Sequence, residues 1–346
     1  MNELFGAYTN EGSEGSEGSE GSEGSEGSEG SSGGGGGGSA SSISAYSGAR
    51  TSTVLANALW STQAELTRSY PGTTAPSIEG SYGGIPDARA LERWSTAVRM
   101  QLYTFELIRS VQFAAAGDTA RLLDAAGTVE ICKLERPGYD RAPPATHPTP
   151  LEQAVLDVIK AGALRSERLN EILMQVQIPY SFFAMLLNLQ PGRHRYTYEL
   201  MAAAMQLSGL AVMQFKHFFR ARRAVDQSTL VQPLLLAPRH GSFPAGHATQ
   251  CYFLANLLVA LIQHRIGGDT QVQLEALAWR ISENRVIAGL HYWDDIHAGK
   301  DLGTKLAGHF VGLATSSAPS SQAIASGSSV TPLQWLWNKA TNEEWN

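Results

Sequence analysis

The sequence predicts an all-α protein, a multi-helix bundle whose candidate site lies at helix ends in the C-terminal half. Three observations support this class. Apolar residues recur at steps of three and four over several long segments, which is the period of an amphipathic helix. Capping and stopping residues bracket these segments. Alternation with period two, the mark of a strand, does not persist. A hydrophobic content of 43% with seven Trp gives the bundle a core to bury.

Residues 1–49 are predicted to be a disordered tail. They repeat Gly-Ser-Glu and then run through six consecutive glycines, a composition with nothing to bury. The tail holds eight of the 32 acidic residues and no Lys or Arg, so the rest of the chain carries 24 acids against 26 basic residues. The formal charge of −6 therefore belongs to the tail, and the body is close to neutral.

Residues 50–148 are predicted to be a helical N-terminal region. One helix is expected over 87–116 and another over 118–126, each beginning at an Asp that can cap it and ending at a Gly. The stretch 136–148 contains four prolines and is expected to be a connection.

Residues 149–315 are predicted to form the main helical domain. Thr149-Pro150-Leu151-Glu152 is a capping box with Pro in the first turn, and it opens a helix that is expected to reach about residue 177. Further helices are expected over 198–224, 243–263 and 272–288.

Residues 316–346 are predicted to be a linker followed by a Trp-rich segment. The linker, 316–330, is rich in Ser, Ala and Gly. The segment 332–345 is a short amphipathic stretch with three Trp, and it is expected to pack on the body or on a partner.

Several classes of protein are disfavoured. The longest apolar run, Cys251 to Ile262, has 12 residues, whereas a membrane-spanning helix needs about 18. The N-terminus lacks the basic and apolar regions of a signal peptide, so a soluble, cytoplasmic protein is expected. Two cysteines, Cys132 and Cys251, are too few for a disulfide framework or a four-cysteine zinc site.

Three short segments in the second half carry residues suited to binding an anion. In the first, Lys216 and Arg223 are seven residues apart, so the spacing places both cations on one face of a helix. Alone, the segment also fits a solvated basic face or a weak nucleic-acid patch. The wider stretch 191–250 has seven Lys or Arg against two acids, which supports an anionic ligand.

The second segment runs from Ser242 to His247 with the sequence SFPAGH. Pro244 suits the first turn of a helix, and Gly246 lets an oxyanion approach the backbone. A helix N-terminus presents amide groups and partial positive charge, so an anion site is expected there with His247 inside it. A lone His at this place also fits a structural or exposed side chain.

The third segment contains Arg285, His291 and Asp295. The last two are four residues apart and share a face if the segment is helical. The carboxylate can then hold one imidazole nitrogen and leave the other as a nucleophile. Arg285 supplies a planar fork suited to an oxyanion, and Gly289 allows a turn that brings it toward His291. Alone, this also fits an ordinary charged helix face.

Taken in order, Lys-x6-Arg, Pro-x-Gly-His and Arg-x5-His-x3-Asp resemble the type 2 phosphatidic acid phosphatase and vanadium haloperoxidase superfamily. The surrounding sequences, QPLLLAPRHGSFPAGHATQ and ENRVIAGLHYWDDIHAGKDLG, look like its soluble bacterial branch. The resemblance covers about residues 164–306. It implies an all-α catalytic domain of the acid phosphatase and haloperoxidase kind.

The resemblance implies a phosphoric monoester hydrolase that needs no metal cation. Lys216, Arg223 and Arg285 would neutralise the non-bridging oxygens of phosphate as charge develops in the transition state. The backbone at Gly246 would add an amide donor. The expected partner is a small anionic phosphoester, with no nucleic acid and no membrane-spanning segment.

The same resemblance assigns the proton and phosphoryl chemistry to three residues. His291 would attack phosphorus and form a transient phosphohistidine, and Asp295 would fix its tautomer. His247 would protonate the leaving alcohol and then take a proton from the water that hydrolyses the intermediate.

The sequence departs from the superfamily pattern at three positions. Ala224 stands where a Pro is usual, which removes a rigid turn. Ala245 replaces a Ser whose hydroxyl would bond an oxyanion, a loss worth about 1–3 kcal/mol of transition-state stabilisation. Asn284 replaces a Ser beside Arg285.

Three alternative functions remain open. A vanadium-dependent haloperoxidase would hold vanadate on His291 and oxidise halide, and His240 favours it because bromide-type enzymes place a second histidine there. His240 also fits a simple rim residue. A weakened anion-binding homologue is the second alternative, favoured by Ala245. A metal hydrolase using His291, Asp294, Asp295 and His297 is the third, although their crowding makes a poor cage.

Overall fold

The computed structural model describes residues 53–68, 91–142, 147–176, 180–262, 265, 268–316 and 330–345. The chain divides into two compact units, and within residues 20–86 the described element is α3 (Thr53–Arg68). The predicted tail over 1–49, most of the linker over 316–330 and the Asp cap at residue 87 lie outside the described residues. All elements discussed below belong to the other unit.

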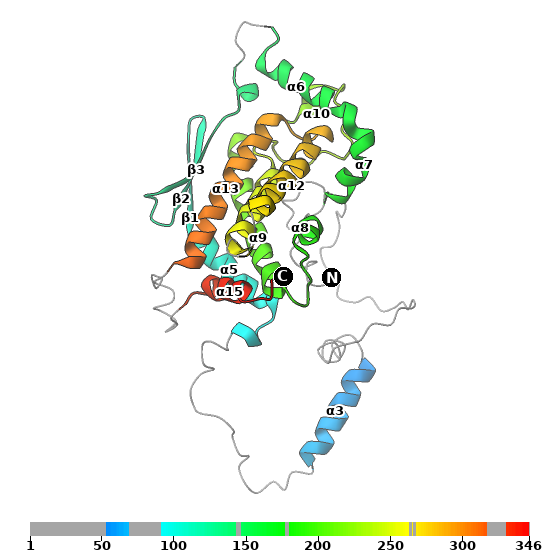
Figure 1. Cartoon of the computed structure of the whole chain (residues 1–346), viewed down its shortest axis with the longest axis vertical. Coiled ribbons are helices and arrows are strands. Elements are labelled where there is room, and N and C mark those ends of the chain that lie inside the picture. The colour runs from blue at the N-terminus through cyan, green and yellow to red at the C-terminus, as the bar shows by residue number, and fades with distance from the viewer. Residues whose placement is uncertain are drawn as a thin grey trace. The chain divides into compact units, whose positions relative to one another are not determined.

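The main unit is mostly helical, as predicted, and it contains one small sheet. Four long helices form its centre: α9 (Arg195–Phe219), α11 (Gly246–Ile262), α12 (Gly268–Ile287) and α13 (Trp293–Thr315). Helix α11 packs against the other three, and α13 also contacts α9 and α12 (Figure 1). Almost every residue of α11 is buried, which explains why the sequence there is apolar on all sides.

The close packing of α11 and α13 depends on two glycines of α13. A Cβ atom at Gly299 would lie 2.6 Å from the Ala245 carbonyl oxygen, and one at Gly303 would lie 2.2 Å from the Thr249 carbonyl oxygen. Glycine therefore lets the two backbones approach directly. This contact brings the N-termini of α11 and α13 together, and both ends carry candidate site residues.

The segment 111–135 is a three-stranded sheet rather than helix, which corrects the expectation for 87–126. Helix α5 (Thr96–Arg109) begins after Ser95, whose side chain accepts a hydrogen bond from the Val98 amide. It is followed by β1 (Val111–Ala116), β2 (Thr119–Asp124) and β3 (Glu130–Glu135), paired antiparallel in that order.

The sheet forms because a hairpin and tertiary packing override local helix propensity. Gly117 has φ of 59° and opens a two-residue loop that pairs Ala116 with Thr119. Leu122 and Cys132 on the inner face are buried, and β3 packs on α13. The Ala-rich stretch in β1 favours helix by intrinsic propensity, so the sequence there conceals the strand.

The predicted capping box at Thr149 is confirmed. The Thr149 side chain accepts from the Glu152 amide, and the Glu152 carboxylate accepts from the Thr149 amide. The helix that it opens is shorter than expected: α6 (Pro150–Ala161) passes through a 3-10 turn, Gly162–Leu164, into α7 (Arg165–Met174). Helices α8 (Tyr180–Leu187) and α10 (Ala224–Gln227) were not anticipated.

The Trp-rich C-terminal segment packs on the body of the chain. Helix α15 (Pro332–Thr341) lies against α9, α5 and α13, with Trp335 and Trp337 buried. Nearby, a buried ion pair between Arg99 and Glu199 joins α5 to α9 at 2.6 Å.

The described helices include none that is both long enough and apolar enough to cross a bilayer.

Candidate functional site

Lys216 and Arg223 converge, although they do not share a helical face as the spacing suggested. Helix α9 ends at Phe219, and Arg220 adopts a left-handed conformation with φ of 50°. Arg223 then precedes α10 as its N-cap. Both side chains nevertheless reach the Gly241 carbonyl oxygen, Lys216 Nζ at 2.9 Å and Arg223 Nη2 at 3.4 Å. The turn at Arg220 therefore brings the two cations together, which the helical spacing was expected to do.

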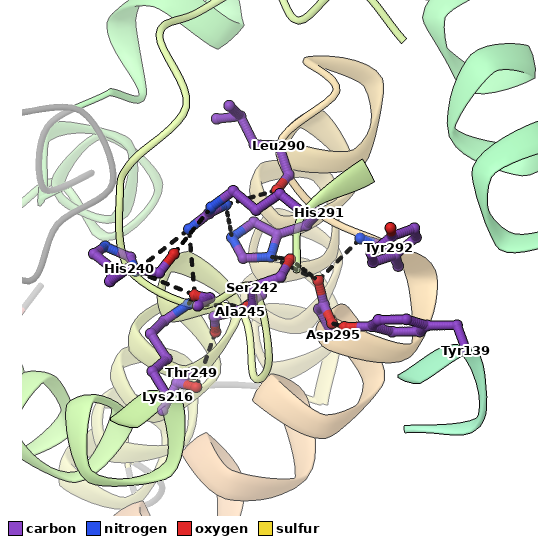
Figure 2. A network of polar contacts seen from close by, with 12 residues as sticks. Tyr139, Lys216, His240, Ser242, Ala245, Thr249, Leu290, His291, Tyr292 and Asp295 are labelled. Atoms are coloured by element: carbon purple, nitrogen blue, oxygen red, sulfur yellow. Dashed lines mark hydrogen bonds and ion pairs between the residues drawn. The ribbon is translucent and has the colours of Figure 1, made fainter. Parts of the chain in front are cut away.

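Arg223 contacts three residues of the site that are labelled in Figure 2: His240, Leu290 and His291. Its Nη1 donates to the Leu290 carbonyl at 2.6 Å and lies 3.5 Å from His291 Nε2. Its Nη2 lies 3.4 Å from His240 Nδ1, and its Nε donates to the His240 carbonyl at 3.3 Å. The guanidinium is thus held beside His291 by backbone oxygens.

His291 and Asp295 are in contact, but not across one helical face. His291 precedes α13, and Asp295 lies in the first turn, where its carboxylate accepts from the Tyr292 amide at 3.0 Å. His291 Nδ1 lies 2.9 Å from Asp295 Oδ2. The chain reaches this point by turning at Gly289, which has φ of 83°, after α12. The expected turn is therefore present, and it delivers His291 to the start of α13.

The Asp295 carboxylate is fully buried and accepts several hydrogen bonds. Ser242 Oγ donates to Oδ2 at 2.5 Å, and Tyr139 OH donates to Oδ1 at 2.6 Å. Burial by itself raises the pKa of Asp295, but the hydrogen bonds and charge of His291, with those of Ser242 and Tyr139, outweigh it, so the pKa lies below the ordinary value. The carboxyl group is therefore ionised at neutral pH.

An ionised Asp295 determines the tautomer of His291. A carboxylate only accepts hydrogen bonds, so the proton shared with it lies on His291 Nδ1. In the neutral imidazole the lone pair is then on Nε2, the nitrogen that faces Arg223. This arrangement provides a nucleophilic nitrogen next to a cation that can hold an anionic electrophile.

The N-terminus of α11 lies next to Asp295. The Ala245 amide donates to the Asp295 carbonyl at 3.0 Å, and α11 begins at Gly246, three residues later than the expected start at 243. Pro244 follows a cis peptide bond and precedes the helix instead of lying in its first turn. His247 is on the first turn and is 1% exposed.

His247 and Arg285 both contact the end of α7. His247 Nε2 lies 2.8 Å from the Gln175 carbonyl oxygen. Arg285 Nη2 donates to the Ile172 carbonyl at 3.1 Å and lies 3.5 Å from Gln175 Oε1. Gln175 thus places two neutral oxygens against the side chains that were expected to bind or protonate a phosphoester.

Helix α12 holds α7 in this position. Arg280 makes a paired contact with Glu171, which lowers the pKa of that carboxyl to about 2. Asn284 Nδ2 donates to Glu171 Oε2 at 3.1 Å and to Gln175 Oε1 at 2.9 Å. The Asn that departs from the superfamily pattern therefore has a structural partner, and it positions Gln175.

The candidate site is enclosed by protein. Its six charged or titratable side chains have exposed fractions between 0% and 2%: Lys216, Arg223, His247, Arg285, His291 and Asp295. His240 is half-buried and lies at the edge. Gln175 covers two of these groups, His247 and Arg285.

Within the described residues, no group of three or more His, Cys, Asp or Glu side chains is arranged to hold a metal ion. His297, one member of the crowded set considered as a metal cage, packs against the Trp279 ring at 5.8 Å between centroids. His297 is exposed, and its ring lies beside α12.

Three contributors to the site were missed by sequence reasoning. Tyr139 lies in a 3-10 turn, Gly138–Asp140, that follows the unexpected sheet. Ser242 was noted only as the start of a motif, and Gln175 only as part of a helix. Tyr139 and Gln175 lie outside the three motifs and reach the site through tertiary packing, so no local signal marks them. Ser242 was visible in the sequence as the polar residue that begins the SFPAGH segment.

Comparison with known proteins gives matches at the level of structure. No protein-family profile matches the chain, and no curated protein matches it at a significant level. A bacterial vanadium-dependent iodoperoxidase has 15% identity and a TM-score of 0.38, over 51% of this chain and 53% of that chain. The match therefore spans about half the length of the iodoperoxidase.

Two phosphatases are also similar in structure. A transmembrane PAP2 type phosphatidylglycerolphosphate phosphatase from Bacillus subtilis has 20% identity and a TM-score of 0.35, over 46% of this chain and 84% of that chain. LpxE from Aquifex aeolicus has 24% identity and a TM-score of 0.29, over 47% and 86%. All three neighbours are members of the superfamily that the motifs resemble. Because every TM-score lies below 0.5, a function has to be argued from this chain's own residues.

Tyr139→Phe is expected to destabilise the protein by about 2 kcal/mol at neutral pH, because the buried carboxylate of Asp295 loses a charged-group hydrogen bond. The lowered pKa of Asp295 means that its stabilisation is present above its unfolded-state pKa and is lost as the pH falls through the folded-state pKa. The variant raises that folded-state pKa, so it should lose this stabilisation at a higher pH. Denaturant unfolding at a series of pH values measures the effect.

Tyr198→Phe is the matched control, since Tyr198 donates to the neutral Leu189 carbonyl. Its effect on the free energy of unfolding should be smaller and independent of pH in the acidic range. If the two variants show the same pH dependence, Tyr139 does not stabilise an ionised Asp295.

Gln175→Ala is expected to raise the affinity for inorganic phosphate about fivefold. The change removes the Oε1 atom that accepts hydrogen bonds from Asn284 and Arg285, so these donors no longer have to leave it to bind phosphate. Breaking one neutral hydrogen bond costs about 1 kcal/mol of binding free energy, and the variant avoids this cost. Titration calorimetry with phosphate measures it, and Gln153→Ala, which alters an exposed Gln bonded to Asp157, serves as the control. Unchanged or weaker phosphate binding in Gln175→Ala would show that the Gln175 amide does not compete with an anion.

Proposed function

We propose that the protein is a metal-independent phosphatase, a phosphoric monoester hydrolase that works through a phosphohistidine. The observation that supports this most strongly is the arrangement of His291. Its Nδ1 is held by the buried, ionised Asp295, and its Nε2 faces the Arg223 guanidinium. An imidazole oriented in this way is a nucleophile, and the adjacent cation attracts a phosphate.

In the first step, the His291 Nε2 lone pair attacks phosphorus while the bond to the leaving oxygen breaks. Arg223, Lys216 and Arg285 take up the charge on the non-bridging oxygens. All three are buried, so their interaction with an anion is screened little by water. His247 donates a proton to the leaving oxygen, and the alcohol departs.

In the second step, water attacks the phosphohistidine. His247 now accepts a proton from that water, the bond between nitrogen and phosphorus breaks, and phosphate leaves. His247 Nε2 lies against the Gln175 carbonyl in the present structure. Substrate would therefore displace the Gln175 segment and take over the donors of His247 and Arg285.

The loss of a serine at Ala245 limits oxyanion stabilisation. Ala245 is fully buried, and the nearby Ser242 hydroxyl donates to Asp295, so it is already used. The remaining donors are the three cations and the backbone amides at the start of α11. We therefore infer that the enzyme is slower than a relative with Ser at this position. The missing hydrogen bond reduces transition-state stabilisation by about 1–3 kcal/mol.

A vanadium-dependent haloperoxidase is the second candidate, and His240 favours it. Its ring lies beside the Arg223 guanidinium at the edge of the buried site, where it could serve halide oxidation. The residues present also fit vanadate, because His291 Nε2 is directed away from its carboxylate and three cations are available for oxyanion oxygens. When bound, vanadate would supply Lewis-acid activation of hydrogen peroxide.

Hydrolysis of p-nitrophenyl phosphate in the presence of EDTA tests the proposal. We expect turnover by the wild type and a loss of about a thousandfold or more in His291→Ala, since the nucleophile is removed. His147→Ala is the control because this histidine is 83% exposed on its side chain and bonds only locally to Glu152 in the contacts described.

The competing functions give different results in the same preparation. Bromide oxidation by hydrogen peroxide that depends on added vanadate, without phosphoester hydrolysis, would replace the phosphatase by the haloperoxidase. Neither activity, with phosphate still bound, would identify an anion-binding homologue. In that case Ala245→Ser should restore some turnover.

A further inference from the structure

A basic pocket of about 370 Å³ lies next to the candidate site and shares Lys216 with it. It opens at the surface between the end of α9 and the loop before α11. Four of its lining residues are cations, two are histidines and one is an acid: Lys216, Arg220, Arg222, Arg239, His217, His240 and Asp226. The proposed phosphatase mechanism uses only Lys216 among them.

The pocket and the candidate site share a wall. Lys216 lines the pocket, and its Nζ donates to the Gly241 and Ser242 carbonyls behind it. His240 and Gly241 also line the pocket, and both contact Arg223 on the inner side. A single layer of side chains would therefore separate an anionic group in the pocket from a phosphate held by Arg223.

The lining of the pocket holds four cationic side chains and one acid. Asp226 accepts a hydrogen bond from the Arg223 amide at 3.1 Å, so its carboxylate is directed to the start of α10. Arg220 and Arg222 are exposed, and the Nε of Arg220 contacts only a neutral backbone oxygen, that of His217, at 3.0 Å. Exposed cations gathered around one acid attract a small anion.

The backbone at Arg220 gives a second reason to assign the pocket a role. Its φ of 50° is a conformation in which glycine is usual at the end of a helix. An arginine there costs conformational energy, and such strain concentrates at binding sites. The same turn places Arg220 on the pocket and lets the chain return to Arg223.

We propose that this basic pocket binds a second anionic group of the substrate, so that the preferred substrate is a small phosphomonoester carrying another phosphate or phosphonate-like group. This proposal rests on the proposed phosphatase activity where it calls the ligand a substrate. Binding of an anion in the pocket does not depend on that activity. The pocket is large enough for a compact anion, and its shared wall with the site sets a short separation between the two charged groups.

Binding of propane-1,3-bisphosphonate and of propylphosphonate by titration calorimetry tests the pocket without any turnover. The wild type should bind the bisphosphonate about tenfold more tightly, because a second anion gains charge-assisted hydrogen bonds. The double variant Arg220→Gln, Arg239→Gln should lose most of this preference. Arg109→Gln, at the last turn of α5 and outside the pocket lining, should keep it.

Folding of the variants is checked by their thermal unfolding, and the single variant Arg220→Lys gives an independent arm. It retains the charge and should keep most of the preference. Equal affinities for the two ligands in the wild type would overturn the proposal. A preference that persists in the double variant would also overturn it.

Kinetics separate a failure of this proposal from a failure of the phosphatase. For the wild type, the ratio of kcat/KM for 1,3-propanediol bisphosphate to that for propyl phosphate should be about ten, and it should fall toward one in the double variant. Hydrolysis of both esters with a ratio of one would contradict the pocket alone. A retained bisphosphonate preference with no hydrolysis would contradict the phosphatase alone.

Discussion

The buried carboxylate of Asp295 is the constraint around which the site is built. A carboxylate removed from water destabilises the fold unless it is hydrogen-bonded, so each of its donors must be supplied by the protein. The donors come from separate places: His291 and the Tyr292 amide at the start of α13, Ser242 before α11, and Tyr139 after the sheet. Satisfying one charge thereby fixes three segments relative to one another and orients the imidazole of His291.

The cations of the site are held differently from the cations of the scaffold. Arg99 and Arg280 are paired with the carboxylates Glu199 and Glu171, which neutralise them. By contrast, Lys216 and Arg223 are described in contact with backbone carbonyls, which position a cation without cancelling its charge. Backbone carbonyls therefore fix where these two cations lie in the site.

The enclosure of the site follows from the same pattern of partners. Gln175 presents neutral oxygens to His247 and Arg285, and α12 holds it there through Glu171 and Asn284. Neutral acceptors satisfy buried donors in the absence of an anion, yet they are weaker partners than phosphate oxygens. A substrate phosphate can therefore replace Gln175 as the partner of these donors.

The sequence predicted well the features that depend on local chemistry. The capping box at Thr149 and the helical core containing α9 were visible because caps and apolar periodicity are short-range signals. The strands at 111–135 were missed because alanines in β1 favour helix, and only packing on α13 decides otherwise.

The motifs indicated which residues gather, but not how they meet. Lys216 and Arg223 converge through the left-handed turn at Arg220 rather than along a helix. Tyr139 and Gln175 could not be found in the sequence, since each is brought to the site by elements distant along the chain. Their roles depend on tertiary contacts, which a single sequence does not encode in any local pattern.

The central claim is that His291 is the nucleophile, and trapping the intermediate tests it most directly. The protein is mixed with p-nitrophenyl phosphate, quenched in alkali, where phosphohistidine survives, and digested for mass spectrometry. We expect one phosphoryl group on the peptide containing His291 in the wild type, more of it in His247→Ala, whose second step is slowed, and none in His291→Ala. Turnover without a label on His291, or a label on another residue, would contradict the claim.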